Sequence, residues 1–544
     1  MIKKYISIIA LAALSFQSCK KDLTIENPNQ PTPATLNNEA GVVAFATGGI
    51  YITGFRSLKF TDGVFGPFWS GALGFHEMMG DVVGADAANA FLNQLGCPNK
   101  VTFDNGTVVL NPNSPNTQYA LVRQANTNQQ GANNFLYYEW AYMYNLIGSC
   151  NLLLEKADAV SFSGDAASKK AAIKAWAYWW RGYAYSRLGS TYYAGIINNT
   201  SLATNGNYVT KEAIITEANR NLDLAVTTAN GAPSATAFTE MLAQIIPSNF
   251  QAGKGFATTP AQLARNVNTL KARNILVNKT TATMTAADWA SILTLANTGI
   301  NSSDNVFTVR TDAVGNLYTS GQFVMGRTQS VAPGGATYKL SERWVQEFKT
   351  GDKRKDQNVK IGVPYLGQSD RGNAHFTRYA LLDGGNGLAG VAIYANTSPS
   401  AYELYAAGNY EENELMKAEA LINTNQIEQG LTIIDAIRNL QGAGLPAVAG
   451  TSLTLAQAKE ELRRERRIVC AFRGLSFYDA RRWGVINPVA QGGGRTGAVL
   501  VSSTGAVSTN GSIEYGFLDY WDVPGNELTY NPAAAGSAPV VNPK

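Results

Sequence analysis

The stretch DGVFGPFWSGALGFHEMMGDVVG carries aromatic and polar side chains between glycines. The rings of Phe68 and Trp69 could stack on a sugar face, while His76, Glu77 or Asp81 could bond to sugar hydroxyl groups. A carbohydrate site requires shallow apolar contact with a few well-placed polar groups. A loop that packs under its own aromatic residues explains the same pattern equally well, so both interpretations stay open.

Catalytic and metal chemistry finds little support in the sequence. Only two histidines occur, His76 and His375, which excludes a histidine-rich metal centre such as H-E-x-x-H. Neither lies in a nucleophile motif, so we assign no catalytic residue, no metal ligand and no cofactor, and a structural calcium ion stays open. Carboxylates are abundant, and a glycoside-hydrolysing pair also stays open because a sequence does not reveal the required separation of roughly 5 to 9.5 Å.

A dense basic cluster, RRERR (463–467), is followed by Arg473, Arg481 and Arg482. Acidic residues are interleaved with these arginines, and the formal charge of the whole chain is only +4. Such a balance does not favour nucleic-acid binding. We therefore expect the arginines to pair with carboxylates across the fold.

The N-terminus is typical of a secretion signal. Lys3 and Lys4 precede an apolar stretch of about 12 residues, which is shorter than the roughly 18 that a spanning helix needs. We expect residues 1–18 to be a lipoprotein signal peptide and Cys19 to become the lipidated first residue. The polar, proline-containing segment up to residue 36 is expected to be a flexible tether.

Two kinds of sequence alternate along residues 37–544, which we interpret as a single domain. The first is amphipathic helix, expected at 37–56, 133–157, 167–190, 211–229, 259–277, 285–299, 401–423, 426–440 and 453–482. The second is loop-rich sequence, dense in Gly, Asn, Thr and aromatic residues, near 57–130, 300–398 and 485–544. The sequence thus predicts a mainly α fold with irregular insertions on one side.

One helix pair can be followed closely in ELMKAEALINTNQIEQGLTIIDAIRNL. Apolar residues at helical spacing stop at Asn423 and resume at Ile427. Ala418 and Gly430 are small, as close approach of two antiparallel helices requires. The pattern indicates a degenerate tetratricopeptide hairpin, and such hairpins bury their faces only by stacking on one another.

Several stretches together resemble the SusD/RagB family of outer-membrane nutrient-binding lipoproteins of Bacteroidetes. The longest, RRERRIVCAFRGLSFYDARRWG, is similar to the family's late helix ending in Asp-x-x-Arg-Trp-Gly. LMKAEALINTNQIEQGLTIIDAIRN resembles the repeat helices before it, and VPGNELTYNP resembles the family's closing element. WWRGYAYSRLGSTYYAGI and YNLIGSCNLLLEKAD resemble two early helices. In a departure from the family pattern, Arg473 stands where a Glu is usual and Ser476 where an Arg is usual.

The resemblance implies about four tetratricopeptide-like helix pairs in a superhelical scaffold that supports a loop-rich ligand face. It also implies a non-catalytic protein anchored by lipid in the outer membrane, facing the exterior. Its implied partner is a SusC-like TonB-dependent barrel, to which it would deliver a bound glycan. Ligand residues of the family vary with the glycan, so the candidates come from the residues themselves: Phe68, Trp69, His76, Asp81, Tyr318 and Tyr379.

Two other functions remain open at this level. An exported helical glycoside hydrolase would need a catalytic carboxylate pair. A peptide-binding or other nutrient-binding lipoprotein of the same uptake type would use the same anchor and scaffold.

Overall fold

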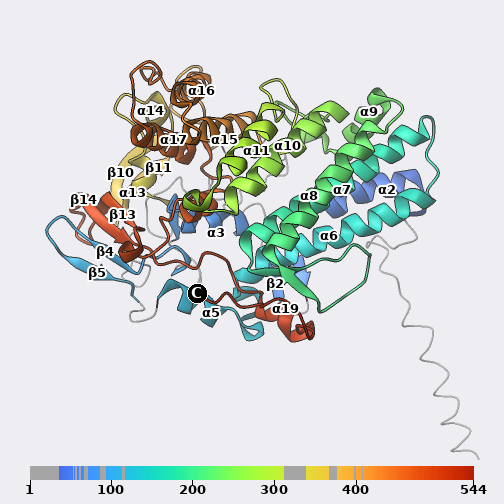
Figure 1. Ribbon diagram of the computed structural model, residues 1–544, viewed down its shortest axis with the longest axis horizontal. Coiled ribbons are helices and arrows are strands. Elements are labelled where there is room, and N and C mark those ends of the chain that lie inside the picture. The colour runs from blue at the N-terminus through green and yellow to red at the C-terminus, as the bar shows by residue number, and fades with distance from the viewer. Residues whose placement is uncertain are drawn as a thin grey trace, which may run out of the picture.

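Helices dominate the computed structural model, which confirms the expected mainly α fold class (Figure 1). The structure describes residues 36–52, 54, 58–60, 63–65, 71–85, 94–112, 117–310, 338–366, 376–396, 398, 400–406 and 408–544. No helix within these ranges is long and apolar enough to span a bilayer.

The helices are α2 (Glu39–Phe45), η3 (Ala46–Ile52), α3 (Gly71–Met79), α5 (Gln118–Ala125), η5 (Asn128–Asn133), α6 (Leu136–Ala159), α7 (Ala166–Thr191), α8 (Lys211–Asn230), α9 (Ala235–Ile245), η6 (Ser248–Phe250), α10 (Pro260–Val277), η7 (Thr281–Thr283), α11 (Ala286–Asn297), α13 (Glu342–Val345), α14 (Lys353–Asn358), α15 (Tyr410–Asn423), α16 (Ile427–Leu440), α17 (Leu455–Val469), α18 (Ser476–Arg482), η9 (Val489–Gln491) and α19 (Gly525–Tyr530). The strands are β1 (Leu58–Phe60), β2 (Gly63–Phe65), β3 (Val83–Ala85), β4 (Lys100–Thr102), β5 (Val108–Leu110), β6 (Ala194–Ile196), β7 (Tyr208–Thr210), β8 (Thr308–Arg310), β9 (Tyr338–Leu340), β10 (Val359–Tyr365), β11 (Thr377–Leu381), β12 (Glu403–Tyr405), β13 (Arg495–Val501) and β14 (Val507–Glu514).

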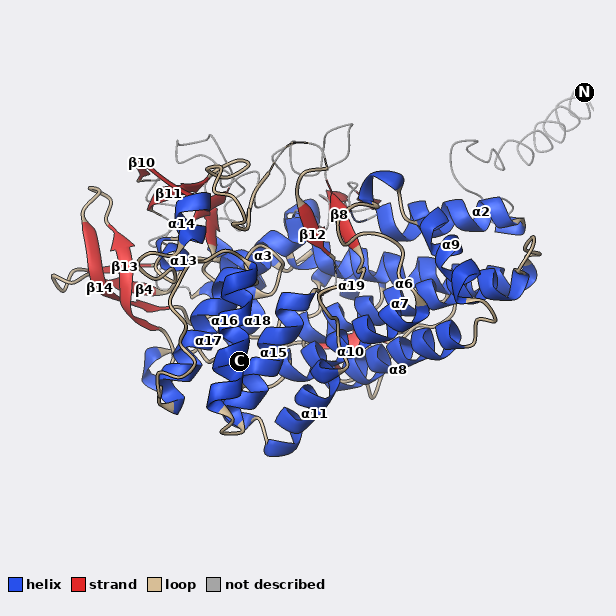
Figure 2. Cartoon of the chain, turned by 90° about the horizontal axis from the view of Figure 1, so that it is seen from above, coloured by secondary structure: helices blue, strands red, loops and turns tan. Residues whose placement is uncertain are grey.

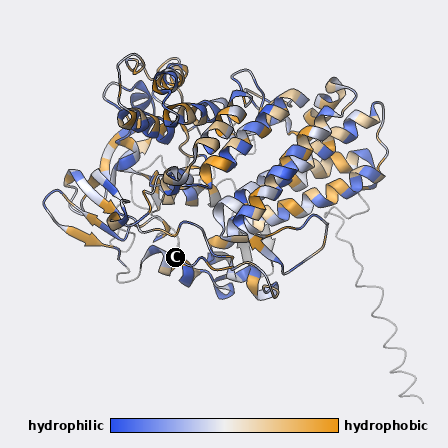
Figure 3. Ribbon diagram, viewed as in Figure 1, coloured by the Kyte–Doolittle hydropathy of each residue, from blue (hydrophilic) through white to orange (hydrophobic). Residues whose placement is uncertain are grey.

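Helices that follow one another in the chain pack side by side: α6 on α7, α7 on α8, α10 on α11 and α15 on α16. This arrangement fits the expected tetratricopeptide-like pairs. Helix α7 lies at the centre, and its Trp176, Trp179 and Trp180 are each at most 1% exposed. All three pack edge-on or tilted against Phe307. Hydrophobic and hydrophilic residues alternate along these helices (Figure 3), because each has one face against the core.

The α15–α16 pair has the close contact that its small residues predict. A Cβ atom at Gly430 would lie 2.6 Å from Cγ1 of Ile422 and 2.9 Å from the carbonyl oxygen of Ala418. The turn between the helices includes Asn425 with φ of 63°, a left-handed conformation that asparagine tolerates better than most residues. Only a glycine at 430 lets the two helices approach to this distance.

The expected helix 453–482 is divided in the structure. Helix α17 ends at Val469 and α18 begins at Ser476, with Phe472 (φ 63°) in the turn between them. The buried carboxylate of Glu77 accepts hydrogen bonds from the backbone amides of Phe472 and Gly474, each at 2.8 Å. These long-range bonds satisfy the amides that a helix break leaves free. A partner almost 400 residues away cannot be read from local periodicity.

Other boundaries also differ from the expectation. Helix α15 begins at Tyr410 rather than at 401, because residues 403–405 form strand β12. Helix α9 was not expected at all; the Ser234 side chain caps it by accepting from the amide of Ala237. Helices α3 and α5 lie inside the segment 57–130, which was expected to be loop-rich.

Short strands join the three loop-rich segments to one another. In the four-stranded sheet β13-β14-β4-β5, β4 of the first segment (57–130) pairs with β14 of the third (485–544). Strand β3 of the first segment pairs with β9 of the second (300–398). Seen from above, the antiparallel strand pairs β10–β11 and β8–β12 lie along one edge of the helical layer, and β13–β14 lies at its end (Figure 2). The described strands of the insertions therefore lie along one edge and one end of the helical scaffold.

Candidate ligand-binding face

A cavity of about 550 Å³ opens between the two hairpins of the four-stranded sheet. Its size falls in the usual range for small-molecule sites. All three loop-rich segments contribute to its lining, which consists of Phe103, Asp104, Asn105, Thr107, Val109, Leu110, Pro112, Phe376, Ser502, Ser503, Thr504, Ala506, Val507 and Ser508. The cavity thus combines two aromatic rings, aliphatic side chains and a row of hydroxyl and amide groups.

Hydrogen bonds from one hairpin to the other hold the cavity in shape. The Asp104 carboxylate accepts from the backbone amides of Thr509 (2.8 Å) and Asn510 (2.9 Å). The Asp104 amide in turn donates to Oγ of Ser508 at 2.8 Å. The bond from the Thr509 amide is the main cause that lowers the pKa of Asp104. Asp104 is therefore an ionised acceptor that fixes the β4–β5 turn to β14.

The apolar part of this face is unusually accessible. Val108 and Leu110 on the edge strand β5 are each 51% exposed, and Val507 on β14 is 40% exposed. Figure 3 shows β5 as a hydrophobic strand at the rim of the molecule. Exposed apolar residues grouped in this way mark binding surfaces more often than isolated ones do.

Three of the residues expected to contact a ligand, His76, Asp81 and Tyr379, are buried instead. His76 on α3 is 0% exposed, and its Nε2 lies 2.7 Å from the Glu139 carboxylate. Burial lowers the pKa of His76, so the imidazole is neutral and Nε2 donates to Glu139. Glu139 also accepts from Nε of Arg187 at 2.5 Å. In this structure His76 belongs to a polar cluster of the core, out of reach of a surface ligand.

Asp81 follows α3 and is 7% exposed. Its carboxylate accepts two hydrogen bonds from Arg343 (2.8 and 3.0 Å) and one each from Ser341 (2.8 Å) and the hydroxyl of Tyr515 (2.5 Å). Burial by itself would raise the pKa of Asp81, but the nearby guanidinium groups and these bonds outweigh it and lower that pKa. The expectation that Asp81 bonds to a ligand is thus replaced by a role in joining all three insertions.

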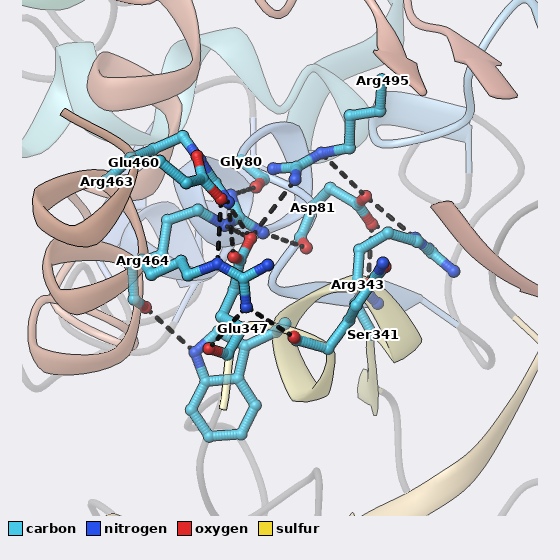
Figure 4. Close-up of polar contacts among 12 residues, drawn as sticks. Gly80, Asp81, Ser341, Arg343, Glu347, Glu460, Arg463, Arg464 and Arg495 are labelled. Carbon is cyan, nitrogen blue, oxygen red and sulfur yellow. Dashed lines mark hydrogen bonds and ion pairs between the residues drawn. The ribbon is translucent and has the colours of Figure 1, made fainter. Parts of the chain in front are cut away.

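The arginine cluster lies around Asp81, and pairing with carboxylates is confirmed for Arg463, Arg464, Arg466, Arg467 and Arg482 (Figure 4). Arg481 instead donates to backbone oxygens, and Arg473 lies over the ring of Tyr405. Arg463 makes a bidentate pair with Glu347 at 2.7 and 2.8 Å. Arg467 donates to the backbone oxygens of Gly80 (2.8 Å) and Asp81 (3.1 Å). In the same way Arg466 pairs with Asp479, and Arg482 pairs with Glu419 and Asp479. Helix α17 thereby holds the first and second insertions through charge-assisted bonds.

Tyr379 lies on β11 and is 8% exposed. The Arg378 guanidinium lies 5.1 Å from the centre of its ring. Arg378 also pairs with Glu342, the residue next to Arg343 on α13. Asp81 and Tyr379 therefore converge on α13 from two insertions. Phe68, Trp69 and Tyr318 lie outside the described residues, as does Cys19, so their roles stay predictions.

The residues that line the cavity were not among those expected to bind a ligand. Two signals were present: Asp104-Asn105-Gly106 and Ser503-Thr504-Gly505 both stand between runs of β-formers, and such turn residues predict hairpins. That the two hairpins lie side by side depends on β4 pairing with β14, some 400 positions along the chain. No local sequence pattern predicts that pairing.

Comparisons with known proteins agree with this architecture. Residues 412–533 match the sequence model of the SusD family. A SusD homolog from Bacteroides thetaiotaomicron superposes with a TM-score of 0.57 at 14% identity, covering 91% of this chain and 97% of its own. A putative sugar-binding protein from Bacteroides vulgatus gives 0.56 at 16%, covering 92% and 99%. A SusD-like carbohydrate-binding protein from the same organism gives 0.55 at 14%, covering 92% and 98%.

No curated protein matches the chain significantly. The structural matches extend far beyond the matched residues 412–533 and include the early helices, whose resemblance was noted from the sequence. The resemblance to the SusD/RagB family is thus confirmed, by sequence over residues 412–533 and by the SusD-like fold over about nine-tenths of the chain.

Proposed function

We propose that the protein is a non-catalytic cell-surface lipoprotein that binds an oligosaccharide or polysaccharide and delivers it to a SusC-like TonB-dependent barrel of the outer membrane. The observation that carries the proposal is the cavity between the β4–β5 and β13–β14 hairpins. Its rings, Phe103 and Phe376, can contact the apolar face of a sugar, and its hydroxyl and amide side chains can exchange hydrogen bonds with sugar hydroxyls.

The structural relatives support this class of ligand. Two of the proteins that share the fold are described as carbohydrate-binding or sugar-binding. The cavity of this chain offers the chemistry that such a ligand needs, in a volume large enough for more than one sugar ring.

Hydrolysis is a weaker interpretation of the same cavity. Among the described residues of its lining, Asp104 is the one carboxylate. A glycosidase of the usual kind needs two, and its general acid requires a raised pKa. The pKa of Asp104 is lowered, and its oxygens are bonded to the backbone of β14. These features favour binding without catalysis.

The N-terminal sequence and the resemblance to the SusD/RagB family support the proposed anchor and partner. Lipidation of Cys19 would hold the protein at the membrane, since acyl chains insert where no spanning helix does, and two or more chains give a lasting hold. A barrel partner would receive the glycan from the loop-rich face.

Affinity gel electrophoresis tests glycan binding against several polysaccharides in parallel. Purified protein lacking residues 1–19 would be run through gels that contain soluble starch, barley β-glucan, xylan, galactomannan or pectin. We expect retardation in at least one gel, and less retardation for Phe103→Ala. If every gel leaves the protein unretarded while an extended peptide library binds, the ligand class is peptide and the proposal is wrong.

A further inference from the structure

A second cleft lies apart from the hairpin cavity, at the junction of the loop after α11 with the start of α15. Its volume is about 240 Å³, below the usual range for drug-sized ligands. The lining is Lys254, Ile300, Asn301, Ser302, Asp304, Val306, Ala392, Tyr405, Asn409, Tyr410, Glu411, Leu440 and Gln441. Every one of these residues is described by the structure.

Two tyrosines form the aromatic wall of this cleft. Tyr405 ends β12, and its ring is held by the guanidinium of Arg473, which lies 5.0 Å from the ring centre. Tyr410 is the first residue of α15 and is only partly buried. Burial raises the pKa of both tyrosines, so their hydroxyls stay protonated and can donate as well as accept. Neither hydroxyl bonds to a described residue.

The polar groups of the cleft are positioned before any ligand arrives. Asn409 caps α15 by accepting from the amide of Glu412 at 3.1 Å. Its Nδ2 donates to Oε2 of Glu411 at 2.5 Å, which fixes that carboxylate. Oε1 of Glu411 has no hydrogen-bond partner among the described residues. Asn301 accepts from the amide and hydroxyl of Ser303 through Oδ1, which leaves its Nδ2 as a donor.

We propose that this cleft is a second saccharide-binding site that accepts one sugar ring. A ring face would lie against Tyr410, and two neighbouring hydroxyls would donate to Glu411 and accept from Asn301. The lining holds two carboxylates, Asp304 and Glu411, and one lysine, Lys254, and this balance favours a neutral sugar over an anionic one. This inference rests on the proposed glycan-binding function, and it adds that a polysaccharide is held at two places, which increases avidity.

Calorimetry with short oligosaccharides tests the second site. Oligosaccharides of four to six units would be prepared from whichever of the five gel polysaccharides retards the protein, and titrated into wild type, Tyr410→Ala and Phe103→Ala. We expect two ligands per wild-type protein and one per Tyr410→Ala protein. Loss of the second contact should also weaken retardation by the parent polysaccharide, roughly two- to tenfold for one aromatic contact.

Controls separate a lost site from a damaged fold. Tyr410→Phe keeps the ring and should keep the stoichiometry, and Tyr530→Ala removes a tyrosine that is 67% exposed on α19, away from both cavities. One ligand per wild-type protein, with Tyr410→Ala unchanged, would overturn the second site and leave glycan binding in place. Absence of binding to all five polysaccharides, together with binding of an extended peptide library, would overturn both.

Discussion

Replacing Asp81 with Asn should destabilise the protein strongly, although Asp81 lies among predicted ligand residues. The side chain of Arg343 is 1% exposed, and Asp81 is its partner at 2.8 Å. The substitution removes the carboxylate that pairs with this buried guanidinium. Removing one member of a buried pair typically costs about 3–5 kcal/mol. Asn keeps one acceptor oxygen, so we expect a decrease in the free energy of unfolding near the lower end, about 3 kcal/mol.

Urea denaturation at pH 7 measures this decrease. Asp158→Asn is the matched control, because it removes the same charge from a side chain that is 61% exposed and pairs with Lys174 at the surface. The control should lose less than about 1 kcal/mol. If Asp81→Asn and Asp158→Asn lower the free energy of unfolding by the same amount, the buried Asp81–Arg343 pair does not hold the insertions together. That result would contradict the role inferred from the contacts in Figure 4.

The pH dependence of the free energy of unfolding gives a second measure of the Asp81–Arg343 pair. The folded-state pKa of Asp81 is lowered from an ordinary value of 3.8. Below about pH 4, Asp81 is protonated in the unfolded chain but still ionised in the folded protein. The stability that Asp81 contributes is therefore fully present above about pH 4 and decreases as the pH falls. The slope from this one group approaches 1.4 kcal/mol per pH unit. Asp81→Asn should lack that component, so the difference between variant and wild type should shrink as the pH falls from 4 to 2.

Three further predictions concern the scaffold and the anchor. Gly430→Ala forces a methyl group against Ile422 and should lower the free energy of unfolding, measured with urea, by about 1–3 kcal/mol. The control Gly148→Ala on α6 places its methyl group where nothing lies within 4 Å, so it should be neutral or stabilising. Equal effects of the two substitutions would contradict the close packing of α15 on α16. Thr454→Ala removes the capping box of α17 and should lower the melting temperature by the equivalent of about 1 kcal/mol, and an unchanged temperature would show that the cap is dispensable. Cys19→Ser should release the full-length protein from the membrane fraction with its circular dichroism intact; retention in the membrane of cells that lack the barrel would contradict lipid anchoring.

The scaffold could be predicted from the sequence because its signals are local. The apolar spacing from Leu415 to Ile437 predicts two helices within a few residues of α15 and α16. The three tryptophans of α7 stand at helical spacing, and they are buried in the core. Cys150 and Cys470 are small side chains buried in the core, and burial raises the pKa of each thiol to about 12.

The ligand face could not be predicted to the same degree, because its residues are brought together by distant pairings. His76 and Asp81 lie in a glycine-rich, aromatic stretch that looks like an exposed loop, yet Glu139, Arg187 and Arg343 bury them. A sequence does not reveal which polar residue finds a buried partner. The turn residues after Phe103 predict a hairpin but not a ligand site, and Phe103 faces a cavity only because β14 lies beside β4.

The most direct test of the central claim is a calorimetric titration of the hairpin cavity. Oligosaccharides from a retarding polysaccharide would be titrated into wild type and Phe103→Ala, with Phe256→Ala as the control for an aromatic residue that is 48% exposed outside the cavity. We predict saturable binding by wild type and by the control, and an affinity roughly two- to tenfold lower for Phe103→Ala with an unchanged melting temperature. Equal affinity for all three proteins would contradict the assignment of this cavity as the glycan site.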